Sequence, residues 1–317
     1  MSFQSVNPAT GEKGFHKACI SKDEIKEQID RVNKAFRARL STDGVDKPRL
    51  KENMATMIKL MNERKEEYAK TISEEIGKPI TQALQEVDKA IKHSKFFLDN
   101  FDEMTKSKEI PTEGAKKAGY HIDPIGVVLI IFPFNFPFST PFRVIAPTMV
   151  AGNGILVRPA SQCGKIGECM AKLFKDSGLD HMDVIYSSTA DTDAIMSHPA
   201  VQGLHLTGST KSGKVVAEIC GRHLKRSVME LGGNDAYIVL QDADVDMAVE
   251  NAITSRLRNC GQVCTSAKRV IIHESLYEAF AHKLKEKVLK MKIGSPSEKD
   301  TEIGPLAKES FAKDVYE

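Results

Sequence analysis

The feature that most constrains the fold is an alternation of strand-like and helix-like segments between residues 126 and 220. It opens with GVVLIIF (126–132), a β-branched run typical of a strand buried on both faces. The other expected elements follow at short intervals: strands at 155–157, 183–186 and 203–206, and helices at about 137–151, 165–177 and 210–220. This alternation predicts an α/β fold with a doubly wound parallel sheet. Ligands bind beyond the carboxyl ends of such strands, where we expect Asn135, Arg158 and Gly208 to lie.

The flanking segments are simpler. Residues 1–20 are expected to form an irregular arm with a turn at NPATG (7–11), and Ser21 with Glu24 predicts a capping box that starts a helix. Further helices are predicted at about 47–75 and 79–101, and an exposed, Lys-rich ribbon suited to contact with a partner at 104–124.

A second unit is expected after Glu230. Its predicted elements are strands at 236–240 and 270–273, helices at 244–258 and 275–290, and a polar tail at 294–317 without a strong pattern. Two strands are too few to close a sheet, so this unit looks incomplete.

Composition narrows the function. A chain of 317 residues can form two domains, and a net charge of +2 gives no reason to expect nucleic acid or an anionic membrane as a partner. Six cysteines without framework spacing, and no signal-peptide pattern at the start, indicate a reducing cytoplasm. The uncharged stretch 124–142 is interrupted by prolines, so we interpret it as a buried strand and turn, not a membrane span.

Three short sequence motifs contain candidate catalytic residues. Cys264 lies in NCGQVCT (259–265), Glu230 in ELGGN (230–234) and Asn135 in PFNFP (133–137). A thiol, a carboxylate and a carboxamide can serve as nucleophile, base and oxyanion donor.

Plainer interpretations stay open for two of these residues. A lone cysteine is more often buried and inert, and Glu230 could be a surface residue before a turn, although we expect partial desolvation to raise its basicity. Cys260 raises a metal or disulfide alternative for the Cys264 loop. No second Cys/His pair follows at ligand spacing, so no metal site is expected.

The stretch GSTKSGK (208–214) nearly matches a phosphate loop, but Val215 stands where Ser or Thr would hold magnesium. We therefore expect Gly208 and Ser209 to present a helix N-terminus to a phosphate without a metal. No G-x-G-x-x-G fingerprint occurs. Arg158 and Ser161 follow a strand end and could bind an anionic group of a nucleotide, although the residues alone favour a plain surface role for Arg158.

Taken together, these motifs resemble the aldehyde dehydrogenase superfamily over essentially the whole chain. The resemblance rests on PFNFP, LTGST (206–210), ELGG and GQVC in the same order and spacing, and on NPATGE at 7–12. The similarity is greatest to bacterial succinate-semialdehyde dehydrogenases, through GRHLK (221–225) leading into ELGGND and through Arg143 and Arg258.

The resemblance implies a Rossmann-like parallel-sheet domain that binds NAD(P) at 1–229, with 104–124 as a bridging ribbon for oligomerisation. Residues 230–317 would be the N-terminal part of an α/β catalytic domain. It implies a homodimer or homotetramer in the full-length form. NADP is favoured over NAD because Arg158 replaces a usual lysine and Ser161 stands where NAD-preferring relatives often carry Glu. The residues it assigns to cofactor binding are Phe132, Pro133, Arg158, Ser161, Gly208, Ser209 and Leu231.

The resemblance also implies oxidation of a small aldehyde to a carboxylic acid through a thiohemiacetal and a thioester on Cys264. Asn135 and the Cys264 N–H would stabilise the oxyanion, and Glu230 would activate water. Arg143 and Arg258 would hold the distal carboxylate of succinate semialdehyde.

Three questions remain at this point. The chain ends at Glu317, before the family's later glutamate motif, so we expect a C-terminally truncated protein. The alternatives are an inactive nucleotide-binding fragment, a dehydrogenase for another short aldehyde, and a CoA-acylating relative, against which Glu230 argues. A reversible disulfide between Cys260 and Cys264 is a further hypothesis if the loop folds back.

Overall fold

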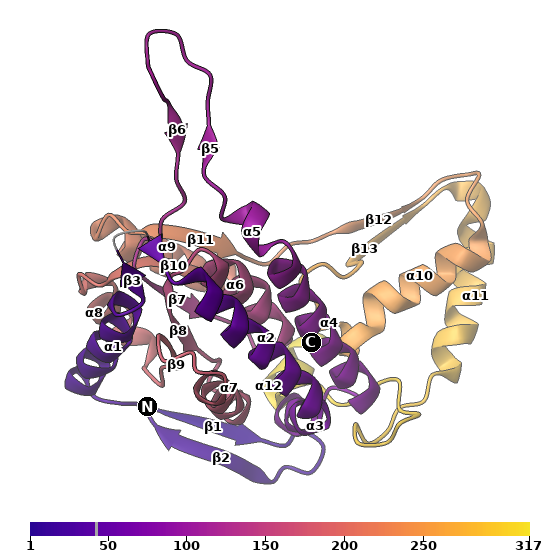
Figure 1. The fold of residues 1–317 in the computed structure, drawn as a ribbon. Coiled ribbons are helices and arrows are strands. Elements are labelled where there is room, and N and C mark those ends of the chain that lie inside the picture. The colour runs from indigo at the N-terminus through magenta and orange to yellow at the C-terminus, as the bar shows by residue number, and fades with distance from the viewer. Residues whose placement is uncertain (42–43) are drawn as a thin grey trace.

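The computed structural model describes residues 1–41 and 44–317, which are arranged around a five-stranded parallel sheet (Figure 1). The strand order is β11-β10-β7-β8-β9, and every pairing is parallel. The strands are β7 (Val127–Ile131), β8 (Gly154–Arg158), β9 (Met182–Val184), β10 (Val201–Thr207) and β11 (Arg226–Glu230). The predicted doubly wound α/β fold is therefore confirmed.

Helices cover both faces of this sheet. One hydrophobic core joins it to α2 (Lys47–Glu63), α3 (Lys65–Ile76), α4 (Ile80–Asp99), α6 (Ser139–Val150) and α7 (Gly164–Asp176). The other core joins it to α1, α8 (Thr192–Ser197) and α9 (Thr210–Arg222). The chain moves from β7 outward to β9 and then returns to β10 on the other side of β7. This reversal leaves a crevice at the carboxyl ends of β7 and β10.

The expected strand and helix positions in this part of the chain are accurate, with two omissions, the short helix α8 and one strand. Strand β11 was not among the predicted strands, although Glu230 was expected at a strand end. Its sequence RSVME is mostly exposed because β11 is an edge strand, so it lacks the apolar run that marks a strand buried on both faces.

The N-terminal helices confirm the capping box and correct one boundary. Ser21 Oγ accepts a hydrogen bond from the Glu24 N–H (3.3 Å), and the Glu24 carboxylate accepts one from the Ser21 N–H (2.7 Å). The helix predicted at 47–75 is wrong as a single element, because the backbone leaves helical geometry at Arg64 (φ −104°). The helices are α1 (Lys22–Arg37), α2 (Lys47–Glu63), α3 (Lys65–Ile76), α4 (Ile80–Asp99) and α5 (Phe101–Met104).

The irregular arm expected at residues 1–20 is wrong. Strands β1 (Ser2–Val6) and β2 (Lys13–Ala18) pair antiparallel around the predicted turn. Phe3 is 1% exposed and packs edge-on against Tyr186, with ring centroids 5.1 Å apart. Burial of this side chain fixes the hairpin to the sheet domain.

Two short antiparallel strand pairs complete this part. One consists of β3 (Leu40–Ser41) and β4 (Gly44–Val45). The other joins β5 (Lys108–Glu109) to β6 (Gly119–Tyr120) and projects from the body as an exposed ribbon, as predicted (Figure 1).

The second unit is small. Strands β12 (Ala236–Val239) and β13 (Arg269–Ile272) pair parallel, and α10 (Val245–Leu257) and α11 (Tyr277–Lys290) form a minor core with them around Val249 and Phe280. One-turn 3-10 helices lie at Thr189–Asp191 and Glu274–Leu276, and Arg258–Gly261 forms a tight turn in which Asn259 and Cys260 have non-helical backbone angles. The prediction of a tail without a strong pattern at 294–317 is partly wrong, because α12 (Glu309–Tyr316) forms there. The ring of its Phe311 packs on that of Phe134, with centroids 5.1 Å apart.

The uncharged stretch 124–142 contains β7, a turn and the start of α6. Across residues 1–41 and 44–317, no helix combines the length and the apolar character that crossing a membrane requires.

Candidate active site

A cavity of about 800 Å³ opens at the carboxyl edge of the sheet, in the crevice described above. It gathers every sequence-predicted site residue except Ser161, which is exposed and outside its lining. The gathered residues are Phe132, Pro133, Asn135, Arg143, Arg158, Gly208, Ser209, Glu230, Leu231, Arg258 and Cys264. Residues far apart in the sequence therefore form one site.

Asn135 lies in the turn between β7 and α6 and is hydrogen-bonded through both its side chain and its main chain. Its side-chain Nδ2 donates to the Gln262 carbonyl (2.8 Å), in the loop that carries Cys264. Its own carbonyl accepts from Lys78 Nζ (2.8 Å) and from Asn259 Nδ2 (2.9 Å). A carboxamide nitrogen has two hydrogens, so the bond to Gln262 fixes the amide plane and leaves one donor for a substrate oxygen.

The loop before Cys264 has an unusual backbone. Asn259, Cys260 and Gly261 are consecutive residues with left-handed φ values of 49°, 57° and 79°. This conformation costs about 1–3 kcal/mol for a residue other than glycine, so the surrounding contacts must hold it. Asn259 supplies them: its N–H donates to Gln82 Oε1 (2.8 Å), and its side chain is fully buried.

Cys264 differs from most other cysteines of the chain in being exposed to the cavity. Cys163, Cys169 and Cys220 are buried, and Cys19 lies outside the cavity, as expected for structural residues. An accessible thiol can react with a ligand in the cavity, whereas buried ones are inert.

Cys260 has a free thiol that donates to the Gly304 carbonyl (3.1 Å), and Cys264 is also free. Burial raises the pKa of Cys260. The reversible disulfide between them stays a prediction. In the part of the chain that the structure describes, no three His, Cys, Asp or Glu side chains are grouped to hold a metal.

Glu230 ends strand β11 and reaches the cavity, but its side chain is exposed, so the expected desolvation is not observed. The edge position of β11 explains this difference. The Glu230 carbonyl accepts from the Gly208 N–H (3.0 Å), which fixes the strand end beside the start of α9. Lys268 Nζ donates to the carbonyls of Gly233 and Cys264 and so connects the loops after the carboxylate and the thiol.

The cavity also has the features of a phosphate site, at the start of α9 and the end of β8. Ser209 caps α9 by accepting from the Ser212 N–H (3.1 Å), and Leu231 packs against Gly213, where an added Cβ would lie 2.6 Å from Leu231 Cδ2. Arg158 Nε donates to the Ser187 carbonyl (2.9 Å), and Nη2 contacts Thr189 Oγ1 (3.0 Å). Burial lowers the pKa of the Arg158 guanidinium, so it is not the plain surface residue that one interpretation allowed.

The cavity is strongly cationic. Glu230 is the one carboxylate among its described lining residues, against seven basic side chains: Lys89, His93, Arg143, Arg158, Arg256, Arg258 and Lys268. Arg258 lies over the Phe136 ring at 5.5 Å. Burial and the charges of Lys89 and Arg143 lower the pKa of His93. Such a lining favours an anionic ligand.

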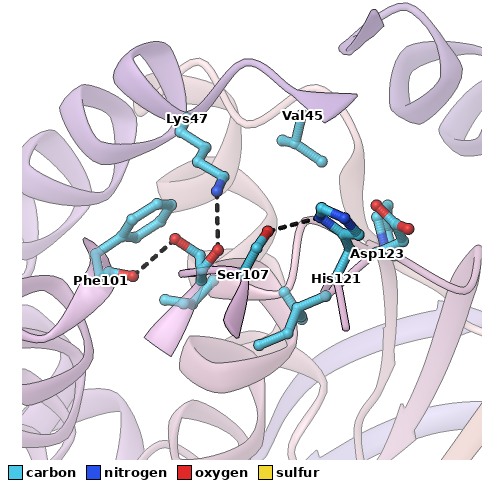
Figure 2. Close-up of a pocket in the computed structure, with 11 residues that line it drawn as sticks. Val45, Lys47, Phe101, Ser107, His121 and Asp123 are labelled. Carbon is cyan, nitrogen blue, oxygen red and sulfur yellow. Dashed lines mark hydrogen bonds between the residues drawn. The ribbon is translucent and has the colours of Figure 1, made fainter. Parts of the chain in front are cut away.

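A second, much smaller cavity of about 80 Å³ lies at the base of the ribbon (Figure 2). Ser107 Oγ contacts His121 Nδ1 (2.7 Å), and Lys47 Nζ donates to the Thr105 carbonyl (3.0 Å), as Figure 2 shows. Its volume is below that of ordinary ligand pockets, so it is no competing site.

Sequence reasoning missed several residues that shape the large cavity. These residues hold the segments around the cavity through their contacts: Lys78, Gln82, Glu86, Asn259, Lys268 and Phe311. One signal was available for Glu86, because it falls in the apolar stripe of α4 beside Ala83, Val87 and Ala90. A charged residue within such a stripe indicates a buried partner.

The arrangement brings a thiol, a carboxylate and a carboxamide to one cavity at the switch point of a doubly wound sheet, and comparisons place the chain among known proteins. The model of the aldehyde dehydrogenase family matches residues 1–317, and the chain belongs to this family. It is 35% identical over 315 residues to the succinate-semialdehyde dehydrogenase [NADP(+)] of Deinococcus radiodurans, covering 99% of this chain and 65% of that protein. The corresponding Mycobacterium leprae protein is 32% identical, with 98% and 68% covered.

The fold is similar to a succinic semialdehyde dehydrogenase from Streptococcus pyogenes solved with NADP+. The TM-score is 0.95 at 28% identity, covering 99% of this chain and 69% of that one. The chain thus spans about two thirds of the length of these relatives.

Proposed function

We propose that this chain carries the site of an NADP-dependent aldehyde dehydrogenase that oxidises succinate semialdehyde to succinate. The observation that carries the proposal is the cavity in which Cys264, Asn135 and Glu230 meet under a cationic lining. The succinate-semialdehyde and NADP+ specificities named for its relatives support the choice of substrate and cofactor.

The proposed chemistry uses three side chains in turn. The Cys264 thiolate adds to the aldehyde carbon, while the Asn135 amide and the Cys264 N–H donate to the oxyanion. The chemistry that NADP supplies when bound is acceptance of the hydride, after which Cys264 carries a thioester. Glu230 then takes a proton from water, whose oxygen adds to the thioester carbon. The carbon–sulfur bond breaks and releases the carboxylic acid and the Cys264 thiolate.

NADP suits the part of the cavity at the start of α9 and the end of β8. The capped N-terminus of α9 at Ser209 presents free N–H groups and the positive end of the helix dipole to a phosphate. Burial lowers the pKa of Arg158, so pairing with a ribose phosphate would offset the desolvation of its charge. NAD is the alternative cofactor. The same proposal makes residues 1–229 an NAD(P)-binding domain, with 104–124 as its bridging ribbon, and residues 230–317 the N-terminal part of a catalytic domain.

Arg143 and Arg258 are the proposed partners of the substrate carboxylate. They reach the same cavity from α6 and from the turn after α10, two elements that approach it separately. A forked guanidinium binds a carboxylate through two parallel hydrogen bonds, so two of them discriminate strongly against uncharged aldehydes.

The test combines turnover with thiol labelling. The chain is mixed with succinate semialdehyde and NADP+, and NADPH is followed by its absorbance; separately, the alkylation of Cys264 by iodoacetamide is timed with and without NADP+. We expect NADPH to form, Cys264→Ser to abolish it, and Cys19→Ser to retain it. Protection of Cys264 by NADP+ without turnover would identify a nucleotide-binding fragment, and neither protection nor turnover would refute the proposal.

We also propose a cytoplasmic homodimer or homotetramer, with the ribbon as a contact. Ile110, Tyr120 and Ile122 on this ribbon are 50%, 45% and 42% exposed, which is unusual for large apolar side chains on a narrow projection. Sedimentation velocity of the chain would contradict this assembly if it gave a monomer at all concentrations.

A further inference from the structure

A buried ion pair lies directly behind the candidate active site. Lys78 precedes α4 and Glu86 lies within it; their side chains are 1% and 0% exposed and hydrogen-bonded to each other. Burying two charges carries a desolvation penalty that a pair alone often fails to repay, so such a pair needs further polar partners.

Both members have such partners, and all of them belong to the site. Lys78 Nζ donates to the Asn135 carbonyl (2.8 Å) and lies 3.8 Å from the centre of the Phe136 ring. The three hydrogens of the ammonium thus face a carboxylate, a carbonyl and an aromatic face.

Glu86 uses its second oxygen at the start of α6. Oε1 accepts from the N–H groups of Phe138 (2.9 Å), the N-cap residue of that helix, and Ser139 (3.0 Å), its first residue. These N–H groups have no partner within α6, and a carboxylate also suits the positive end of the helix dipole. The ion pair therefore holds the turn 135–139 from both sides.

Helix α4, which carries Glu86, also holds the loop that carries Cys264. Gln82, one turn before Glu86, accepts from the N–H of Asn259, the first of the three left-handed residues. Asn259 in turn donates to the Asn135 carbonyl that Lys78 also contacts (2.9 Å). Asn135 and the Cys264 loop therefore share one support, the start of α4.

We propose that Lys78 is a positioning residue for the oxyanion donor and the nucleophile: its ammonium, fixed by Glu86, sets the Asn135 turn against the loop that carries Cys264. This inference rests on the roles proposed above for Asn135 and Cys264. It assigns to a buried lysine, which touches no ligand, the alignment of two groups that do.

The test uses a variant that removes the ammonium without leaving a buried charge, Lys78→Met with Glu86→Gln. The glutamine oxygen can still accept from Phe138 and Ser139, so the fold is retained. Amide hydrogen exchange of the full chain is measured by mass spectrometry. We expect exchange in segments 134–140 and 258–264 to accelerate by about tenfold, as for loss of a hydrogen bond to a charged group, with the central strands unchanged.

Lys65→Met with Asp88→Asn is the matched control, because it removes a more exposed ion pair on the same helix, between Lys65 of α3 and Asp88 of α4 (2.7 Å). It should leave both segments unchanged. Equal exchange in the two double variants, or acceleration spread over the whole chain, would overturn the proposal.

A second variant and a kinetic measurement test the same proposal. If Lys78→Met with Glu86→Gln fails to fold, Gln82→Met tests the same support, and unchanged exchange in 258–264 would then overturn it. In a chain that turns over, the double variant should lower kcat and leave KM for the aldehyde unchanged. A wild-type chain without turnover refutes the proposed function but leaves the exchange result as the test of Lys78.

Discussion

The left-handed turn before Cys264 gives a prediction whose size can be worked out from contacts. At Gly261 the φ angle is +79°, and an added Cβ would lie 2.5 Å from Arg256 Nη1 and 3.2 Å from the Arg256 carbonyl oxygen. The side-chain atom can move aside, but the backbone oxygen cannot. For Gly261→Ala we expect about 1–2 kcal/mol from the left-handed backbone. The carbonyl contact adds about 1 kcal/mol, as in a mildly overpacked core.

Two other glycines separate these contributions. Gly11 has a φ of +76° with nothing within 4 Å of an added Cβ, so Gly11→Ala should show the backbone penalty alone. Gly221 lies in α9 with no positive φ and nothing within 4 Å, so Gly221→Ala should stabilise the chain by roughly 0.5 kcal/mol.

The assay is urea unfolding, with the free energy of unfolding of each variant compared with that of the wild type. From most to least stable, the expected order is Gly221→Ala, wild type, Gly11→Ala and then Gly261→Ala. A Gly261→Ala variant as stable as Gly11→Ala would refute the steric argument, and one as stable as the wild type would refute the left-handed turn itself.

Three further predictions concern charge. Arg143→Gln should raise KM for succinate semialdehyde about tenfold or more, since a charge-assisted contact is lost, and leave an uncharged aldehyde unaffected; steady-state kinetics with both substrates check this, and equal losses would contradict carboxylate recognition. Arg158→Glu should disfavour NADP relative to NAD by charge repulsion, and an unchanged ratio of kcat/KM for the two cofactors would exclude the assignment. Burial raises the pKa of Glu75 from 4.5 to about 8, so the folded chain keeps a proton that the unfolded chain loses between these values. Stability should therefore fall with rising pH across that window, by up to about 1.4 kcal/mol per pH unit, and Glu75→Gln should remove the slope. Urea unfolding across the window measures it, and a flat wild-type profile would mean that the Lys165 and Ile166 N–H groups keep Glu75 ionised.

Much of the parallel sheet domain follows from local pattern. The run 126–132 and the strands after it have apolar side chains that only a sheet covered on both faces can bury, so their order along the chain predicts their class. The same reasoning fails for β11 and for β1–β2, whose side chains are largely exposed or half-buried and whose pairing depends on distant neighbours. It also fails at Arg64, where only the backbone geometry reveals that one expected helix is two.

The candidate site divides in the same way. The sequence by itself determined the chemical groups, because a thiol, a carboxylate and a carboxamide beside glycine or proline are recognisable from residue type and order alone. Tertiary structure alone decided how they are held: Lys78 has no signal in the sequence, Glu86 shows only its place in an apolar stripe, and the two become a buried support only when α4 packs behind the Asn135 turn. Hydrogen bonds between residues more than fifty positions apart have no local signature, since their geometry is set by the packing of the elements that carry them.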